Sequence, residues 1–241
     1  MGTMEHQPRI AAIYDIHGNR TALEAVLAEI DALGIQRIVV GGDIAWGTEP
    51  RACVDRVMRL GIRAKFVRGN ADREVADGHD NLAAVPPEIA QITAWCAKQL
   101  NAAQRVFLGT LPEFQRLTVS GLGPVFFCHG SPRSDEEAIS EWMREGEVEA
   151  MVRPVRERTI VCGHTHVHFD RQVAGKRIIN AGSVGLHHDS GACWAILGPD
   201  VEFRRTPYDV DLAVARVAAS GVPGDEEFIY HLRNPDPGQH G

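Results

Sequence analysis

The N-terminal part of the chain alternates short apolar segments with amphipathic ones, and this order restricts the fold more than any other feature of the sequence. Residues 10–14, 37–40 and 63–67 are short apolar runs, which are typical of buried strands. Between them, residues 21–33 and 50–60 carry apolar side chains at helical spacing. A β-α-β-α-β order predicts a parallel sheet with right-handed crossover connections.

The remainder of the chain mixes helices and strands. We expect helices at residues 86–100, 136–149 and 210–219, with a connector at 108–112. We expect strands at residues 115–119, 124–127, 159–162, 168–173, 178–179, 193–197 and 201–205. Because the sequence contains no internal repeat and no linker, it predicts one domain at residues 8–233, with flexible termini at 1–7 and 234–241.

The composition favours a globular protein of a reducing compartment. The 241 residues carry a net charge of −7, which argues against stable nucleic-acid binding because such binding requires a basic surface. No apolar stretch approaches the roughly 20 residues that cross a bilayer, so no membrane contact is expected. The five cysteines are widely spaced, without a Cys-x-x-Cys pair, which argues against a disulfide framework. We therefore expect a cytoplasmic protein, and the composition predicts no particular oligomeric state.

Five of the expected strands end on residue types that bind metal ions. These residues are Asp15, His17, Asp43, Asn70, His129, His164 and His166. Carboxylate and imidazole ligands together suit divalent Mn, Fe, Zn, Co or Ni. The two pairs with one residue between them would point the same way on an extended segment. Because ligands of open α/β sheets bind beyond the carboxyl ends of the strands, all seven side chains are expected to meet at one edge.

Each of these residues has a structural alternative when it is taken alone. An aspartate after a strand is often a turn former. Asn70 follows a glycine and fits a left-handed turn. A single histidine at a strand end is often a hydrogen-bonded polar group without a ligand. The occurrence of all seven residues at strand ends favours a metal site over these alternatives.

Five motifs occur in the order Asp-x-His, Gly-Asp, Gly-Asn, His-Gly and Gly-His-x-His. With this set of motifs, the chain resembles the calcineurin-like metallophosphoesterases. The similarity extends from residue 10 to about residue 208. It is greatest to the compact phosphodiesterases of the YfcE type, whose Asn-Pro-Gly-Ser-Val-Gly segment is similar to residues 180–185. The resemblance implies a four-layer α/β/β/α sandwich, in which two mixed sheets are flanked by helices. It also implies a hydrolase of phosphoesters, either a phosphodiesterase or a phosphatase.

The resemblance further implies a role for each ligand. One divalent ion would be held by Asp15, His17 and His166, the other by Asn70, His129 and His164, with Asp43 bridging both. Two such ions clamp the phosphoryl oxygens and acidify a bridging water, whose hydroxide attacks phosphorus. Asp43, Asn70 and His129 would thus act in catalysis, and Asn70 and His164 in phosphate binding. Asn19 is a further candidate for phosphate contact, and its alternative role is the N-cap of the first helix.

One position departs from the family pattern. Many members carry a histidine after Gly-Asn, which donates a proton to the leaving alcohol, and this chain has Ala71 there. The candidate replacements are His187 and His188, with Asp72 and His168 as weaker alternatives. A general acid contributes about 10²–10⁴-fold to a rate. Two hypotheses follow: a phosphoesterase acting on a small molecule or a phosphoprotein, or a metal- or phosphate-binding scaffold with little or no catalytic activity.

Overall fold

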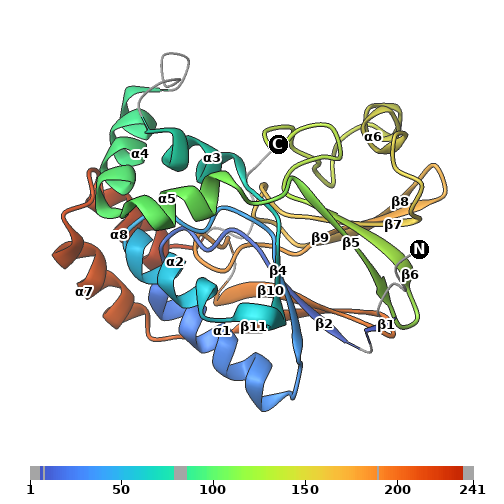
Figure 1. The fold of residues 1–241 in the computed structure, drawn as a ribbon, viewed down its shortest axis with the longest axis horizontal. Coiled ribbons are helices and arrows are strands. Elements are labelled where there is room, and N and C mark those ends of the chain that lie inside the picture. The colour runs from blue at the N-terminus through green and yellow to red at the C-terminus, as the bar shows by residue number, and fades with distance from the viewer. Residues whose placement is uncertain (1–5, 8, 79–85, 189, 236–241) are drawn as a thin grey trace.

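The computed structural model describes residues 6–7, 9–78, 86–188 and 190–235 as two mixed β-sheets with helices on their outer faces (Figure 1). The five-stranded sheet has the order β11-β10-β2-β3-β4, with β2 at Ile10–Ile13, β3 at Arg37–Val40, β4 at Ala64–Phe66, β10 at Ala192–Leu197 and β11 at Val201–Thr206. The six-stranded sheet has the order β1-β5-β6-β7-β9-β8, with β1 at His6–Gln7, β5 at Phe114–Val119, β6 at Gly123–Cys128, β7 at Thr159–Cys162, β8 at Phe169–Val173 and β9 at Lys176–Asn180. The helices are α1 at Arg20–Ala32, α2 at Pro50–Met58, α3 at Asn70–Asp77, α4 at Pro87–Gln99, α5 at Ala102–Gly109, α6 at Glu145–Val152, α7 at Val210–Ser220 and α8 at Asp225–Arg233, with a 3-10 turn at Gly61–Arg63.

The N-terminal β-α-β-α-β unit is as the sequence predicts. Strands β2, β3 and β4 are parallel neighbours, and Ile10 aligns with Arg37 and Ile38 with Ala64. The antiparallel strands β10 and β11 extend this sheet on the side of β2, which makes it mixed. The carboxyl ends of the three parallel strands therefore lie at one edge, where their following loops begin.

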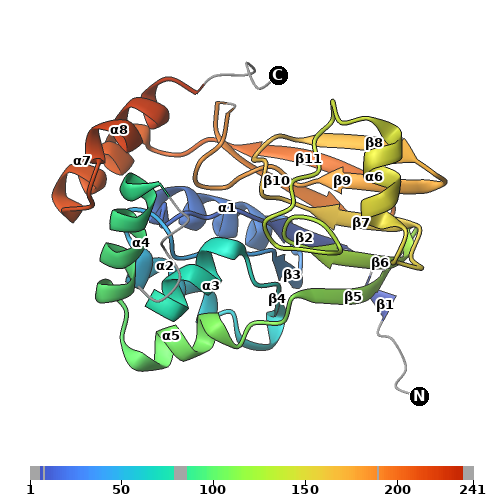
Figure 2. The ribbon, with the colours of Figure 1, turned by 90° about the horizontal axis from the view of Figure 1, so that it is seen from above.

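Alternate side chains of the strands face different cores, and this alternation produces the four layers. On β2, Ala11 and Ile13 pack against the helices, whereas Ile10 and Ala12 pack between the two sheets. On β6, Val125 and Phe127 belong to the core between the sheets, and Phe126 and Cys128 pack with α6. Figure 2 shows α3, α4, α5, α7 and α8 gathered at one end of the sheets, with α6 on its own over the six-stranded sheet. The predicted sandwich of two mixed sheets flanked by helices is thus confirmed.

The helix expected over residues 136–149 is wrong over most of its length, because α6 begins only at Glu145. The Arg171 guanidinium donates hydrogen bonds to the backbone carbonyls of Ser140 (3.0 Å), Glu141 (2.7 Å) and Met143 (3.0 Å). A distant side chain thus donates to these backbone carbonyls in place of a helical N–H. This tertiary contact explains why the segment before α6 forms turns.

Three helices, α3, α5 and α8, were not expected. At the start of α5, the side chains of Asn101 and Gln104 each bind the other residue's backbone N–H, so the connector expected at 108–112 overlaps the last turn of a capped helix. Helix α8 carries three acidic residues in its first turn and His231 and Arg233 in its last, which complements the helix dipole. Both signals are present in the sequence.

Part of the expected flexible N-terminus is described: residues 6–7 form strand β1, which pairs in parallel with β5. Residues 1–5 and 236–241 of the expected termini lie outside the described residues. In the part of the chain that the structure describes, no helix combines the length and apolarity that spanning a membrane requires.

Candidate metal centre

The seven predicted ligands follow five strands, and these strands come from both sheets. Six of them form two groups whose ligand atoms lie within 4.8 Å of one another in each group. The first triad consists of Asp15, His17 and His166, and the second triad of Asp43, His129 and His164. The five-stranded sheet supplies the loops after β2, β3 and β4, and the six-stranded sheet supplies those after β6 and β7. The carboxyl ends of strands from both sheets thus contribute to the site, and a single parallel sheet does not account for it.

The expectation that paired ligands lie on extended segments is wrong. Asp15 (φ 53°), His17 (φ 45°), His164 (φ 68°) and His166 (φ 63°) all adopt the left-handed region, as does Asp43 (φ 53°). Residues other than glycine rarely do so, at a cost of order 1–3 kcal/mol each, and they persist only where the surroundings fix them. The side chains converge because each loop turns sharply at its ligands.

Two glycines leave room for the aspartates. A Cβ atom on Gly69 would lie 2.1 Å from Asp43 Oδ1, and one on Gly163 would lie 2.5 Å from Asp15 Oδ2. Neither distance is possible for a real side chain, so the backbone passes beside each carboxylate only because these positions are glycine. This agrees with the glycines of the Gly-Asn and Gly-His motifs.

In the first triad, His17 and Asp15 each have one polar atom bound to the protein and one near the other ligands. His17 Nδ1 lies 3.1 Å from the carbonyl of Trp46, to which it donates, so Nε2 is left for a ligand. Nε2 is 3.1 Å from His166 Nε2 and 3.8 Å from Asp15 Oδ1. Burial, together with the neighbouring His166, lowers the pKa of His17 to about 4, so this ring is neutral near pH 7. The other carboxylate oxygen, Asp15 Oδ2, accepts the backbone N–H of His164 at 2.9 Å.

In the second triad, His129 is likewise bound to a backbone carbonyl through one ring nitrogen, but its pKa is raised. His129 Nδ1 donates to the carbonyl of Gly41 at 2.9 Å, and Nε2 lies 3.4 Å from Asp43 Oδ2. Although burial opposes the charged form, the carboxylate of Asp43 raises the pKa of His129 to about 10. Burial likewise opposes ionisation of Asp43, yet the positive charge of His129 holds the pKa of that carboxyl well below its usual range. Asp43 Oδ1 accepts the N–H of Ala71 at 3.0 Å.

Three buried polar atoms at this centre have no hydrogen bond within the described residues: Asp15 Oδ1, Asn70 Oδ1 and His129 Nε2. A buried polar atom left without a partner costs about 1–3 kcal/mol. The Asn70 amide contacts Glu74 through Nδ2, at 3.5 Å, which leaves Oδ1 free. All three residues belong to the predicted ligand set, so the donor atoms present fit a divalent cation.

Asp43 lies between the two triads. Its Oδ2 is 3.7 Å from His17 Nε2 in the first triad and 3.4 Å from His129 Nε2 in the second. The loop that carries it is fixed by Asp72, whose side chain accepts the backbone N–H groups of Ile44, Ala45 and Gly69. Burial and the charge of Asp43 raise the pKa of Asp72 to about 7. Asp72, a weaker candidate for the proton donor, is thus engaged with backbone.

The two leading candidates for the missing proton donor lie in different surroundings. His187 is buried, and its Nε2 lies 2.8 Å from the hydroxyl of Tyr208. The ring of His188 lies 6.1 Å from that of His166, measured between centroids. His168 turns elsewhere, with Nε2 2.8 Å from the carbonyl of Ala181. The ring of His188 thus lies beside the first triad.

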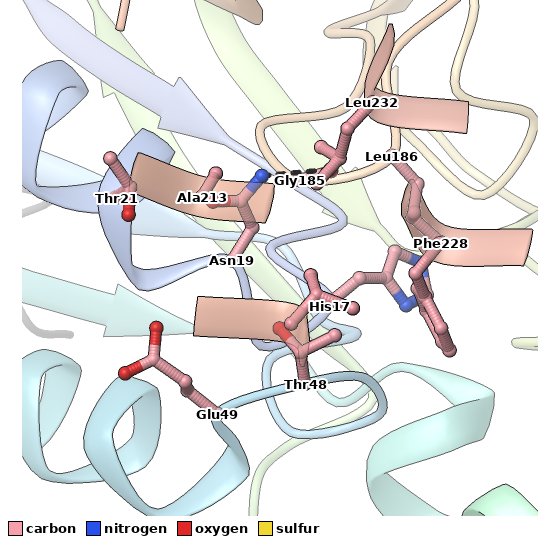
Figure 3. A pocket seen from close by; sticks show the side chains of 11 residues that line it. His17, Asn19, Thr21, Thr48, Glu49, Gly185, Leu186, Ala213, Phe228 and Leu232 are labelled. Atoms are coloured by element: carbon pink, nitrogen blue, oxygen red, sulfur yellow. Dashed lines mark hydrogen bonds between the residues drawn. The ribbon is translucent and has the colours of Figure 1, made fainter. Parts of the chain in front are cut away.

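Asn19 performs its structural role. Its Oδ1 accepts the N–H of Ala22 at 3.0 Å and caps α1, so the N-cap alternative is confirmed. Its Nδ2 lies 3.2 Å from the carbonyl of Gly185, drawn as a dashed line in Figure 3, and 3.4 Å from the hydroxyl of Tyr208. A phosphate contact from Asn19 stays a prediction.

Further residues hold the ligand loops, and for Asn180 and Tyr208 the sequence assigned no such role. Asn180 Nδ2 donates to the carbonyl of Gly163 at 2.6 Å, and Ser183 Oγ donates to the carbonyl of Asp15 at 2.8 Å. Both lie in the segment 180–185 whose similarity to the family was noted, so a signal existed. Tyr208, which contacts Asn19 and His187, has no local sequence signal, because its role depends on distant loops.

Comparisons with known proteins agree with this geometry. The model of the calcineurin-like phosphoesterase superfamily domain matches residues 9–200. An uncharacterised protein of Methanocaldococcus jannaschii is 29% identical over 244 residues, which cover 91% of this chain and 97% of that protein. The crystal structure of a metallophosphoesterase from Sphaerobacter thermophilus is 30% identical with a TM-score of 0.75, covering 95% of this chain and 99% of that one.

A hypothetical protein of Pyrococcus horikoshii has the same fold, with a TM-score of 0.83 at 22% identity over 97% of this chain and 100% of that chain. The similar solved structures also include the E. coli phosphoesterase YfcE, at 19% identity and a TM-score of 0.48 over 78% of this chain and 87% of that one. The match of the family model over residues 9–200 confirms the family resemblance inferred from the motifs. The chain belongs to the calcineurin-like phosphoesterase superfamily.

Proposed function

We propose that the protein hydrolyses phosphoesters, as a phosphodiesterase or phosphatase, with one divalent ion at each triad and Asp43 shared between them. The observation that carries the proposal is the position of Asp43 Oδ2, 3.7 Å from His17 Nε2 and 3.4 Å from His129 Nε2. The free Oδ1 atoms of Asp15 and Asn70 add ligands to either side. Membership of the superfamily supports the reaction class.

The buried side chains of the two triads would fix the orientation of the ligands and exclude bulk water from the site. Divalent ions held by the two triads would supply positive charge for the phosphoryl oxygens and would lower the pKa of a bound water. Asp15, Asp43 and His129 are almost fully buried, so their orientation is set before substrate arrives. His164 is half-buried, and burial and the nearby His129 lower its pKa, which favours the neutral ring that binds a cation. With Asn70, His164 is our candidate for contact with the substrate phosphate.

For the proton donor that Ala71 cannot supply, we infer His188 instead of His187. The Nε2 atom of His187 is engaged by Tyr208, whereas the ring of His188 contacts that of His166. A donor beside the first triad would reach the leaving-group oxygen of a substrate bound between the triads. Phosphoesters with poor leaving groups depend most on such a donor.

The direct test is hydrolysis of bis-p-nitrophenyl phosphate and p-nitrophenyl phosphate by the protein loaded with Mn²⁺, Fe²⁺, Zn²⁺, Co²⁺ or Ni²⁺. We expect turnover that disappears on chelation and returns with metal. The site variant is Asp43→Asn. The matched control is Asp31→Asn, the same chemical change at an exposed residue that pairs with Arg63.

Metal analysis of the same samples separates the two functional hypotheses. Two bound ions without turnover on any phosphoester would contradict the enzyme and favour a metal- or phosphate-binding scaffold, the hypothesis that Ala71 motivates. Turnover without any bound metal would contradict both.

A further inference from the structure

Helix α8 brings a histidine, His231, next to the candidate proton donor. The ring of His231 lies 5.6 Å from that of His188, in an edge-to-face arrangement at 82°. The ring of His188 lies in turn 6.1 Å from that of His166 in the first triad, at 31°. The rings of His166, His188 and His231 thus form a row from the first triad to α8. This helix lies beyond residues 9–200, the part that the superfamily model matches.

Helix α8 is firmly seated against the loop of the first triad. Phe228 packs on Trp46 with ring centroids 5.7 Å apart, and the carbonyl of Trp46 accepts the hydrogen bond that orients His17. Phe228 and Leu232 line one small pocket together with His17, as Figure 3 shows. Phe228 and Leu232, which lie near His231 on α8, therefore anchor this helix beside His17.

His231 also lies beside the backbone of the loop that carries His188. Burial and the nearby His166 lower the pKa of His231, although the adjacent backbone of His187 and Leu186 favours its charged form. On the opposite side, the N–H of Gly185 donates to the carbonyl of Asp15 at 2.9 Å. The loop is thus clamped between the first triad and α8, with His188 at its end.

We infer that His231 is a positioning residue, which holds the His188 imidazole beside the first triad so that it faces the leaving group of the substrate. The inference rests on the proposed function. In that step water forms the new P–O bond and gives one proton to solvent. The P–O bond to the leaving group breaks with its electron pair on the leaving oxygen, which takes the N–H proton of His188, and solvent later restores that proton. Substrates with alkyl or unsubstituted aryl leaving groups would need this contact most.

The kinetic test compares His231→Ala with Tyr230→Ala, a neighbour on the same helix whose side chain is 68% exposed. The substrates are bis-aryl phosphates whose leaving phenols range from 4-nitrophenol to phenol. We expect His231→Ala to lower kcat about tenfold for the phenyl ester, a part of the about 10²–10⁴-fold that a general acid contributes, with an unchanged KM. For the 4-nitrophenyl ester kcat should stay within about twofold, and Tyr230→Ala should leave both unchanged.

Two further variants separate positioning from damage to the fold. His231→Asn keeps an N–H donor and should restore part of the lost rate on the phenyl ester. In a His188→Ala background, His231→Ala should have no further effect, because the group that it positions is gone. Equal losses on both esters, or an additive double variant, would overturn the inference.

A second measurement needs no turnover. With ¹⁵N-labelled histidine and Zn²⁺-loaded protein, the ring signals of His188, assigned with His188→Ala, should be sharp in the parent and in Tyr230→Ala. They should broaden or shift in His231→Ala. An unchanged His188 signal would overturn the positioning role whether or not the protein is active, whereas an inactive parent with the expected signals would count against the proposed function alone.

Discussion

The two triads have the same composition, one aspartate and two histidines, but the pKa of one histidine is lowered in the first triad and raised in the second. The pKa of His17 in the first triad is lowered to about 4 by burial and by His166, which it faces at 3.1 Å. The pKa of His129 in the second triad is raised to about 10, because Asp43 lies 3.4 Å away and outweighs its burial. Two triads with the same residue types therefore differ in charge, because the carboxylate of Asp43 lies close to the imidazole of His129. Metal binding should displace a proton from His129 and none from His17.

The largest effect that separates the triads should come from their aspartates. We expect Asp43→Asn to reduce turnover by more than the about 10–100-fold that loss of an outer partner of a metal ligand costs, because Oδ2 faces both triads. Asp15→Asn should remove mainly the ion of the first triad. Metal content by mass spectrometry and turnover on bis-p-nitrophenyl phosphate check this. Equal loss of ions in the two variants would show that Asp43 is not shared.

The glycines beside the aspartates offer the next comparison. Gly69→Ala would place a Cβ 2.1 Å from Asp43 Oδ1, and Gly163→Ala would place one 2.5 Å from Asp15 Oδ2. We expect each variant to lose turnover about 10–100-fold, as when other partners of metal ligands are disturbed. The control is Gly146→Ala in α6, where a Cβ meets no atom within 4 Å and helix propensity should stabilise by up to about 1 kcal/mol. Unchanged turnover in Gly69→Ala would contradict the tight approach at Asp43.

Calorimetry can test the difference in protonation directly. At pH 8 the ring of His129 carries a proton, because the pH lies below its pKa of about 10, whereas His17 is neutral, because the pH lies above its pKa of about 4. Metal must displace the proton from His129, so affinity at the second triad should rise with pH up to about 10. Titrations in buffers of different ionisation enthalpy should show about one proton fewer released by His129→Asn than by His17→Asn. The same proton count in both variants would refute the assignment.

The smallest effect concerns the outer support of the first triad. Tyr208→Phe removes the hydroxyl that lies 2.8 Å from His187 Nε2 and 3.4 Å from Asn19 Nδ2. The free energy of unfolding should fall by about 1 kcal/mol, the net value of a typical buried hydrogen bond, with kcat within about twofold. Urea denaturation and the standard assay measure both. A large loss of kcat without a change in stability would instead assign His187 to the catalytic step.

The strand ends could be read from the sequence with little error. Strands β3 and β7 occupy the residues expected, and the ligands follow them because a buried apolar run must stop where a polar loop begins. Where prediction failed, a distant partner decided the local structure. The segment before α6 is held in turns by Arg171, from β8, a contact that no local pattern reveals. The left-handed ligands Asp15 and Asp43 are a further case, since only the packed loops fix such backbone.

The sequence by itself determined the ligand types, their order along the chain and the family, because these depend on residue identity and on short-range spacing. It also revealed that Ala71 cannot donate a proton. Only the tertiary structure decided which histidine holds a proton and that the ring of His188 lies beside that of His166. These outcomes depend on distances of three to six ångströms between residues far apart in the chain, and pairing of charges and burial act only once the two sheets and α8 are packed together.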